Sequence, residues 1–297
     1  MSHEISTVVD QMSFTECPRW RDGRIWFADF YTCRVLSAAQ DGSDRRTEAE
    51  VPGQPSGLGW LPDGRLLIVS QHDRTILRRE TDGTLAIHAD ISSYALGHLN
   101  DMIVDSNGRA YVGNFGFDLM AGEPVASTSL VRVDPDGTTA VAATDLWFPN
   151  GAVVTPDGVL LVDETFGNRI TAFDITADGT LTNRRTWAAF GQPPQHSALD
   201  KAMSELVVAP DGCTLDAEGC LWVADAIGGR AVRVREGGEI VDEIVPGTGV
   251  FACALGGSDG HTLFLCVAPD FLEANRKPVL EAQILATRVD VPATAHA

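Results

Sequence analysis

The sequence predicts an all-β fold, a six-bladed β-propeller, and two observations carry that prediction. A phrase made of a short apolar run, a turn ending in glycine and an apolar strand occurs six times along the 297 residues. Its turn glycines are Gly23, Gly64, Gly108, Gly158, Gly219 and Gly260. They are separated by 41, 44, 50, 61 and 41 residues. Periods of about 40 to 50 residues built from short strands are typical of propeller blades.

Each copy of the phrase supplies two strands, and a second hairpin follows it. The copies run over Glu16–Asp29, Ser56–Ser70, Asn100–Asn114, Asn150–Glu164, Asp211–Asp225 and Ala252–Cys266. In the second copy, for example, Thr75–Arg78 leads through Asp82-Gly83 into Leu85–Ile87. Dipeptides such as Asp-Gly provide the positive φ angles that tight hairpins need. Two hairpins per repeat predict four strands per blade.

Residues 1–297 are predicted to form one propeller domain whose N- and C-terminal strands close one blade. We expect a strand within Ile284–Val289 to pair with one around Ile5–Val9, because an open ring would leave unpaired strand edges. Two longer excursions, near 121–127 and 191–203, are expected to be loops over one face that shape a pocket.

Composition narrows the partners and the compartment. The formal net charge is −19, which argues against nucleic-acid binding, and no apolar stretch approaches the roughly 18 residues of a membrane span. The N-terminus lacks the basic and apolar segments of a secretory signal. Six cysteines without a CxxC pair indicate reduced thiols. We therefore expect a cytoplasmic protein that binds neither membrane nor nucleic acid; the sequence contains no indication of its oligomeric state.

Candidate site residues share one register. Counting eight residues back from each turn glycine, or seven in the first copy, gives Glu16, Ser56, Asn100, Asn150, Asp211 and Ala252. Innermost strands of a propeller line its channel, so four oxygen-bearing side chains are expected to converge there. Two carboxylates and two amides suit a hard cation such as Ca²⁺, Mg²⁺ or Mn²⁺, and zinc held by carboxylates and water is an alternative. Asn-Gly and Asp-Gly are also ordinary turn dipeptides, which is the competing interpretation of Asn150 and Asp211.

Four segments resemble the SMP-30/gluconolactonase family, also called regucalcin-like. They are Glu16-Cys17-Pro18-Arg19-Trp20, Asn100-Asp101-Met102 with Gly108–Tyr111, Asn150-Gly151, and Pro210-Asp211-Gly212 through Asp216–Val223. The motifs occur in family order and cover essentially the whole chain. The resemblance implies a six-bladed propeller, which the repeat count predicts independently.

The resemblance also implies roles for individual residues. Glu16, Asn150 and Asp211 would hold one divalent cation, with Ca²⁺ preferred, and Asp211 would serve as the acid/base of lactone hydrolysis. Asn100 would contact the substrate or, as in some relatives, the metal.

Two further positions bear on the substrate. Asp118 falls where sugar-lactone members have a substrate-contacting Glu, and His98 stands where they often have Arg. A neutral imidazole can hydrogen-bond but lacks the five-donor fork of Arg.

The leading hypothesis is therefore a metal-dependent lactonase that opens a small sugar-acid or related carboxylic lactone. A cation polarises the carbonyl while a carboxylate takes a proton from water. Asp211 is the expected base, Asp101 is the fallback, and a nucleophilic Asp211 is a further alternative. Two other functions stay open: a phosphotriesterase-like or broad esterase, and a calcium- or ligand-binding propeller without turnover.

Overall fold

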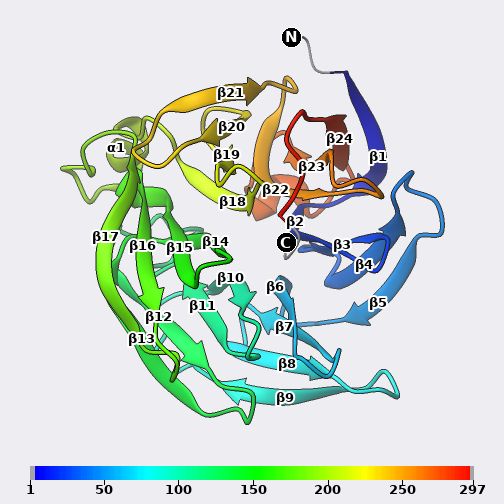
Figure 1. Cartoon of the computed structure of the whole chain (residues 1–297), viewed down its shortest axis with the longest axis horizontal. Helices are drawn as coiled ribbons and strands as arrows, with labels where there is room; N and C mark the ends of the chain where they lie inside the picture. Colours follow the sequence, from blue (N-terminus) through cyan, green and yellow to red (C-terminus); the bar gives the residue numbers. More distant parts are fainter. Residues whose placement is uncertain (1–3, 295–297) are drawn as a thin grey trace.

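The computed structural model describes residues 4–294 and shows six four-stranded antiparallel sheets around a central channel (Figure 1). The predicted six-bladed β-propeller is confirmed. Residues 1–3 and 295–297 of the expected 1–297 span lie outside the described residues.

The strands of each blade are given in order from the channel outward. The first two blades contain β2 (Thr15–Arg21), β3 (Arg24–Asp29), β4 (Arg34–Ala39), β5 (Arg46–Glu50), β6 (Pro55–Trp60), β7 (Leu66–Ser70), β8 (Thr75–Arg79) and β9 (Leu85–Asp90). The next two contain β10 (Leu99–Val104), β11 (Ala110–Asn114), β12 (Thr128–Val133), β13 (Thr139–Leu146), β14 (Pro149–Val154), β15 (Val159–Glu164), β16 (Arg169–Ile175) and β17 (Leu181–Ala189). The last two contain β18 (Pro210–Leu215), β19 (Leu221–Asp225), β20 (Arg230–Val234), β21 (Ile240–Ile244), β22 (Gly249–Gly256), β23 (Thr262–Ala268), β24 (Ala282–Arg288) and β1 (Ile5–Met12).

The sixth blade joins the two ends of the described chain. β1 pairs with β24, with Ile5 opposite Thr287 and Met12 opposite Ala282, and the two strands lie side by side in Figure 1. Because β1 forms the outer edge of a sheet whose other strands come from the far end of the sequence, this pairing closes the ring.

Burial explains why the strand sequences differ with distance from the channel. The second strands β7 and β19 are buried along their whole length, since neighbouring blades cover both of their faces. They therefore read as continuous apolar runs. Outer strands such as β13 face solvent, and most of their residues are partly or fully exposed.

The six turn glycines all adopt the left-handed conformation, as predicted from the repeat. Their φ angles lie between 73° at Gly23 and 86° at Gly64. A side chain is disfavoured there, because the left-handed region brings Cβ against the backbone. The glycines thus fix the hairpin between the two innermost strands of each blade.

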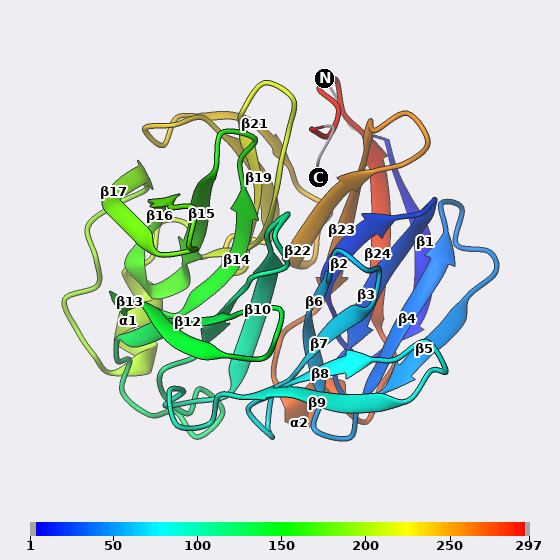
Figure 2. The ribbon, with the colours of Figure 1, turned by 60° about the horizontal axis from the view of Figure 1, so that its bottom comes forward.

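The longer connections gather on one face of the ring. The β11–β12 loop and the β17–β18 connection, which contains α1 (Leu199–Ser204), meet where the Val125 backbone N–H donates to the Ser197 carbonyl at 2.7 Å. The helices α1 and α2 (Glu273–Arg276) both lie on the lower side of the molecule in Figure 2. A single 3₁₀ turn, η1 (Thr165–Gly167), follows β15. Among the described residues, no helix is long and apolar enough to cross a membrane.

Candidate functional site

The innermost strands share an irregularity at the predicted site. In all six blades the pairing between the first two strands shifts register at or beside the channel position, for example between Pro149 and Ala152 and between Pro210 and Cys213. Such bulges re-aim side chains and are common beside active sites.

The glycines after two of these residues have a packing role. A Cβ added at Gly151 would lie 2.4 Å from the carbonyl oxygen of Asp211, and one at Gly212 would lie 2.4 Å from Cβ of Ala252. Only glycine lets neighbouring innermost strands approach this closely. Asn150-Gly151 and Asp211-Gly212 therefore lie within β14 and β18 and are not turn dipeptides.

Four of the predicted residues line one cavity. Glu16, Asn100, Asn150 and Asp211, from β2, β10, β14 and β18, all face a cavity of about 100 Å³ at the loop-rich mouth of the channel. The other two register positions do not line it. Ser56 donates to the Asn100 carbonyl at 2.7 Å, and Ala252 is buried in a core cluster.

The sixth blade is offset by one residue from the expected register. Phe251, and not Ala252, faces the cavity, because the register of β22 shifts between Val250 and Ala252.

Both amide side chains donate a hydrogen bond to the protein. Asn150 Nδ2 donates to the Thr165 hydroxyl at 3.1 Å, and that hydroxyl donates to the Pro210 carbonyl at 2.8 Å. Asn100 Nδ2 donates to the Pro149 carbonyl at 3.4 Å. With the nitrogens used in this way, the amide oxygens are the atoms left to accept from a ligand or bind a cation.

Burial controls the ionisation of the two carboxylates. Desolvation raises the pKa of Glu16 to about 8, an effect that the Cys17 backbone N–H at 2.9 Å partly opposes and nearby Asp101 increases. Desolvation also raises the pKa of Asp211, and the neighbouring Glu16 and Asp163 carboxyls raise it further. Carboxyl groups grouped in this way need a positive charge nearby in order to ionise together.

A third carboxyl, Asp163, lies below the site. It is 0% exposed, and neither of its oxygens has a hydrogen-bond partner in the described part of the chain. Burial raises its pKa, while a contact with the Cys213 side chain acts in the opposite direction. At the matching point of the first and fifth blades, before Asp29 and Asp225, the residues are Ala28 and Ala224. Asp163 is thus an extra buried carboxyl.

The donor set fits a hard divalent cation. Two carboxylates and two amide oxygens from four blades face one small cavity, and such oxygen donors suit Ca²⁺ or Mg²⁺. Within residues 4–294 no three His, Cys, Asp or Glu side chains form a metal-binding cluster. A cation would therefore rely on the amide oxygens as well as on Glu16 and Asp211, unlike the Cys and His ligation of structural zinc.

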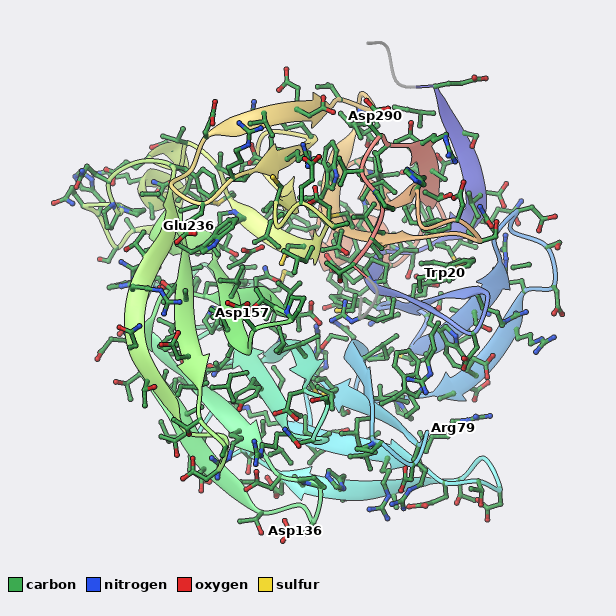
Figure 3. All side chains as sticks on the ribbon, in the orientation of Figure 1. Trp20, Arg79, Asp136, Asp157, Glu236 and Asp290 are labelled. Atoms are coloured by element: carbon green, nitrogen blue, oxygen red, sulfur yellow. The ribbon has the colours of Figure 1, made fainter. Side chains whose placement is uncertain are left out.

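Asp101 is near Glu16 and Asp211 but has a different partner. Its Oδ1 accepts from Arg19 Nη2 at 2.8 Å and from the Met102 backbone N–H at 2.7 Å, and it does not line the cavity. Arg19 faces a second cavity, of about 270 Å³, at the opposite mouth of the channel. Figure 3 shows that mouth, where Trp20 and Asp157 lie on either side of the channel.

The two expected substrate residues take different positions. His98 lines the cavity with its ring 4.4 Å from that of His72, and burial followed by the charge of His72 lowers its pKa. Asp118 is exposed on the β11–β12 loop, outside the lining, and its Oδ1 accepts from the Ala121 backbone N–H at 2.9 Å. The structure brings His98 to the site and leaves Asp118 beside it.

Sequence reasoning missed a set of buried anchors that hold the cavity loops. Asp29, Glu164 and Asp225 end the second strands of three blades, and each accepts from a backbone N–H just before an innermost strand: Phe14, Trp147 and Ala209. Each also forms an ion pair with an arginine five residues later, namely Arg34, Arg169 and Arg230. The repeated acid–arginine spacing was the signal that could have revealed them.

Aromatic side chains of the cavity were also largely missed. Eight of its lining residues are phenylalanine or tyrosine, among them Phe14, Phe30, Phe115, Phe148, Phe166 and Phe251. Of the two aromatic residues before Pro149, Phe148 faces the cavity, while Trp147 packs against a hydrophobic cluster that includes Phe117.

A family model described as "SMP-30/Gluconolactonase/LRE-like region" matches residues 14–269. The chain belongs to this family. The resemblance stated from the motifs is therefore confirmed.

Two curated relatives match this chain over most of its length. A 6-deoxy-6-sulfogluconolactonase of Pseudomonas putida is 27% identical, with 100% of this chain and 98% of that protein covered. The pentonolactonase XacC of Haloferax volcanii is 28% identical, with 89% and 85% covered. A crystal structure of a calcium-binding protein, regucalcin, from Agrobacterium tumefaciens shares the fold, with a TM-score of 0.76, 20% identity, and 98% of this chain and 96% of that chain covered.

Proposed function

We propose that this family member is a divalent-cation-dependent lactonase. The observation that carries the proposal is the convergence of Glu16, Asn100, Asn150 and Asp211 in one cavity at the channel mouth. The names of two relatives, a sulfogluconolactonase and a pentonolactonase, support lactone hydrolysis as the reaction.

The proposed cation ligands are Glu16, Asn150 and Asp211, with Ca²⁺ as the preferred ion and Zn²⁺, Mg²⁺ and Mn²⁺ as alternatives. The oxygen-only donor set supports this choice, as does the description of the Agrobacterium relative as calcium-binding. A bound cation would polarise the lactone carbonyl and stabilise the developing oxyanion. Asn100, whose amide nitrogen is held by Pro149, would contact the substrate through its oxygen.

Asp211 is the proposed acid/base. It takes a proton from water as the water oxygen bonds to the carbonyl carbon, and it returns a proton to the ring oxygen as the ring C–O bond breaks. The product is a hydroxy acid, which releases a proton to solvent. Asp101, the alternative base, is paired with Arg19 and faces away from the cavity, which favours a structural role for it. Attack by Asp211 itself, with a covalent intermediate, is the alternative route.

His98 and Asp118 are proposed on the substrate side, with Asp118 acting from the exposed loop. We further propose that the protein works in the cytoplasm, since all six cysteines are unpaired.

The test is a hydrolysis screen that follows acid release from lactones, aryl esters and phosphotriesters, with and without EDTA. We expect turnover of lactones that is lost on chelation and restored by Ca²⁺. Turnover that survives complete cation removal would contradict the mechanism. Preference for phosphotriesters or aryl esters would favour the broad-hydrolase alternative, and tight cation binding without turnover would favour a binding propeller.

A further inference from the structure

Two aromatic walls face each other across the cavity. The first wall consists of Phe14, Phe30 and Phe251, with ring centroids 5.4 Å apart for Phe14–Phe30 and 4.9 Å for Phe14–Phe251. It belongs to the first and sixth blades.

The second wall consists of Phe115, Phe148 and Phe166. The Phe115 and Phe148 rings stack at 4.5 Å, and Phe166 meets Phe148 edge-on at 5.6 Å. These residues belong to the third and fourth blades, which in a ring of six lie opposite the sixth and first. The space above the four oxygen-bearing residues is therefore bounded on two opposite sides by ring faces and edges.

Besides the four oxygen-bearing residues, the lining offers a sugar the imidazoles of His72 and His98 and few other free polar groups. Gln54 and Gln71 hydrogen-bond to each other at 2.7 Å, and the Thr165 hydroxyl is already engaged with Pro210 and Asn150. Among the described residues that line the cavity, Gln71 Nε2 is the one fully buried donor without a partner, which suits one acceptor on a ligand. A polyhydroxylated ring would lose hydration at several hydroxyls and recover few hydrogen bonds.

Charge in the lining disfavours an anionic ligand. None of the described lining residues is Lys or Arg, whereas Glu16, Asp211 and Glu273 are all acidic. A carboxylate or sulfonate on the substrate would have no cationic side chain to pair with there, although Arg or Lys usually binds such groups.

The rim of the cavity is apolar as well. Met120 and Ile227 both line it and are 42% and 46% exposed, so each presents hydrocarbon to solvent at the entrance. Because both side chains belong to the lining, a ligand group that enters the cavity there contacts hydrocarbon and not charge. The volume of about 100 Å³ limits the enclosed part of a ligand to roughly one ring, since a cavity of ~150 Å³ holds benzene.

We propose that the substrate is a neutral lactone bearing an aryl or short alkyl group, whose apolar part lies between the two aromatic walls. This inference rests on the proposed lactonase function and names its substrate class. The reaction is unchanged: water adds its oxygen to the carbonyl carbon, the ring oxygen leaves with a proton, and a hydroxy acid forms.

The first experiment compares kcat/KM of the calcium-loaded protein for γ-phenyl-γ-butyrolactone and for D-glucono-δ-lactone, each corrected for spontaneous hydrolysis. We expect at least a tenfold preference for the phenyl lactone. Equal or faster turnover of the gluconolactone would overturn the inference while leaving the lactonase proposal intact.

A binding measurement separates the two proposals when turnover is absent. Titration calorimetry with two stable amide analogues, 5-phenylpyrrolidin-2-one and D-glucono-δ-lactam, should show at least tenfold tighter binding of the phenyl compound. If the phenyl lactam binds tightly but no lactone is hydrolysed, the lactonase proposal fails and the apolar ligand class stands. If the gluconolactam binds as tightly, or neither binds, the inference is wrong.

Rim variants test where the apolar group lies. Met120→Gln and Ile227→Asn together should lower kcat/KM for the phenyl lactone about tenfold with an unchanged melting temperature, because both side chains are partly exposed. The matched control is Ile87→Asn on β9, which is 69% exposed and outside the cavity lining and should change neither value. An unaltered kcat/KM in the rim double variant would contradict the proposed placement.

Discussion

Along β10, Asn100 faces the cavity at one mouth of the channel, and the next residue, Asp101, faces Arg19 toward the other mouth. The first mouth has acidic side chains grouped without a nearby Lys or Arg in its lining. At the second, the carboxylate already has its cation, in a 2.8 Å ion pair. Neighbouring residues on one strand therefore have different uses. Asn100, among carboxyls that no Lys or Arg of the lining pairs with, is available for a ligand. Asp101, which is paired with Arg19, stabilises the ring.

The largest expected effect distinguishes Asp211 from Asp101. Asp211→Asn should lower kcat for lactone hydrolysis about 10³-fold, because the general base is removed. Asp101→Asn, as the matched variant, should keep kcat within a few-fold once both proteins are shown to be folded. Steady-state assays with circular dichroism provide the measurement. Loss of turnover in Asp101→Asn alone would reverse the assignment.

The ion pair should matter for stability instead. Removing one partner of a buried pair leaves the other charge uncompensated, so Asp101→Asn should lower the free energy of unfolding by about 3 kcal/mol. Arg19 is 18% exposed, which places the expected value at the lower end of the usual range. Urea denaturation measures it. The double variant Asp101→Asn with Arg19→Met should recover part of the loss; a double variant less stable than either single variant would argue against the pair.

A variant at Asp163 tests whether the cavity end of the channel holds more buried carboxyl groups than the cation-free protein can stabilise. Asp163→Ala places in the fourth blade the residue type found at Ala28 and Ala224, and it removes a buried carboxyl without hydrogen-bond partners. The cation-free protein should become about 2 kcal/mol more stable, since an unsatisfied buried polar group is costly. Calcium affinity, measured by calorimetry, should weaken because a carboxyl that can ionise near the bound cation is lost. A less stable cation-free variant would show that the carboxyl has an unrecognised partner.

The last expected effect is a pH slope in the cation-free protein. Burial raises the pKa of Glu16 to about 8, above the roughly 4.3 of an exposed Glu, so between these values the folded state binds a proton that the unfolded state lacks. Folding stability should therefore fall as pH rises from about 4.5 to 8, by at most about 1.4 kcal/mol per pH unit. Glu16→Gln should flatten this slope in denaturant titrations across that range. A slope of the opposite sign would contradict the described environment of Glu16.

The fold could be predicted from the sequence because each blade repeats the same turn glycine and apolar strands. Asn150 and Asp211 could be placed at the cavity for the same reason, since their spacing from the glycines encodes their height in the channel. The bulges could not be predicted, because they depend on the pairing between strands. They explain why Phe251 replaces Ala252 at the cavity.

The aromatic walls could not be predicted for a related reason. Phe115, Phe148 and Phe251 lie at strand ends or in loops just outside the repeated phrase, where no register applies. Asp163 was hidden in a different way: it continues an apolar run, Leu160 to Val162, and only its burial without a partner makes it distinctive.

The pairing of β1 with β24 also has a consequence for how the molecule forms. Ile5 can pair with Thr287 only after β24 has been synthesised, so in N-to-C synthesis the first strand waits for the last strand of its sheet. Contacts of such high sequence separation slow folding and leave strand edges exposed meanwhile. Glu16 and Asp211, from the first and fifth blades, come together in the same closing ring. A ribosome-bound chain that stops before β18 therefore lacks Asp211 and the complete set of cavity oxygens.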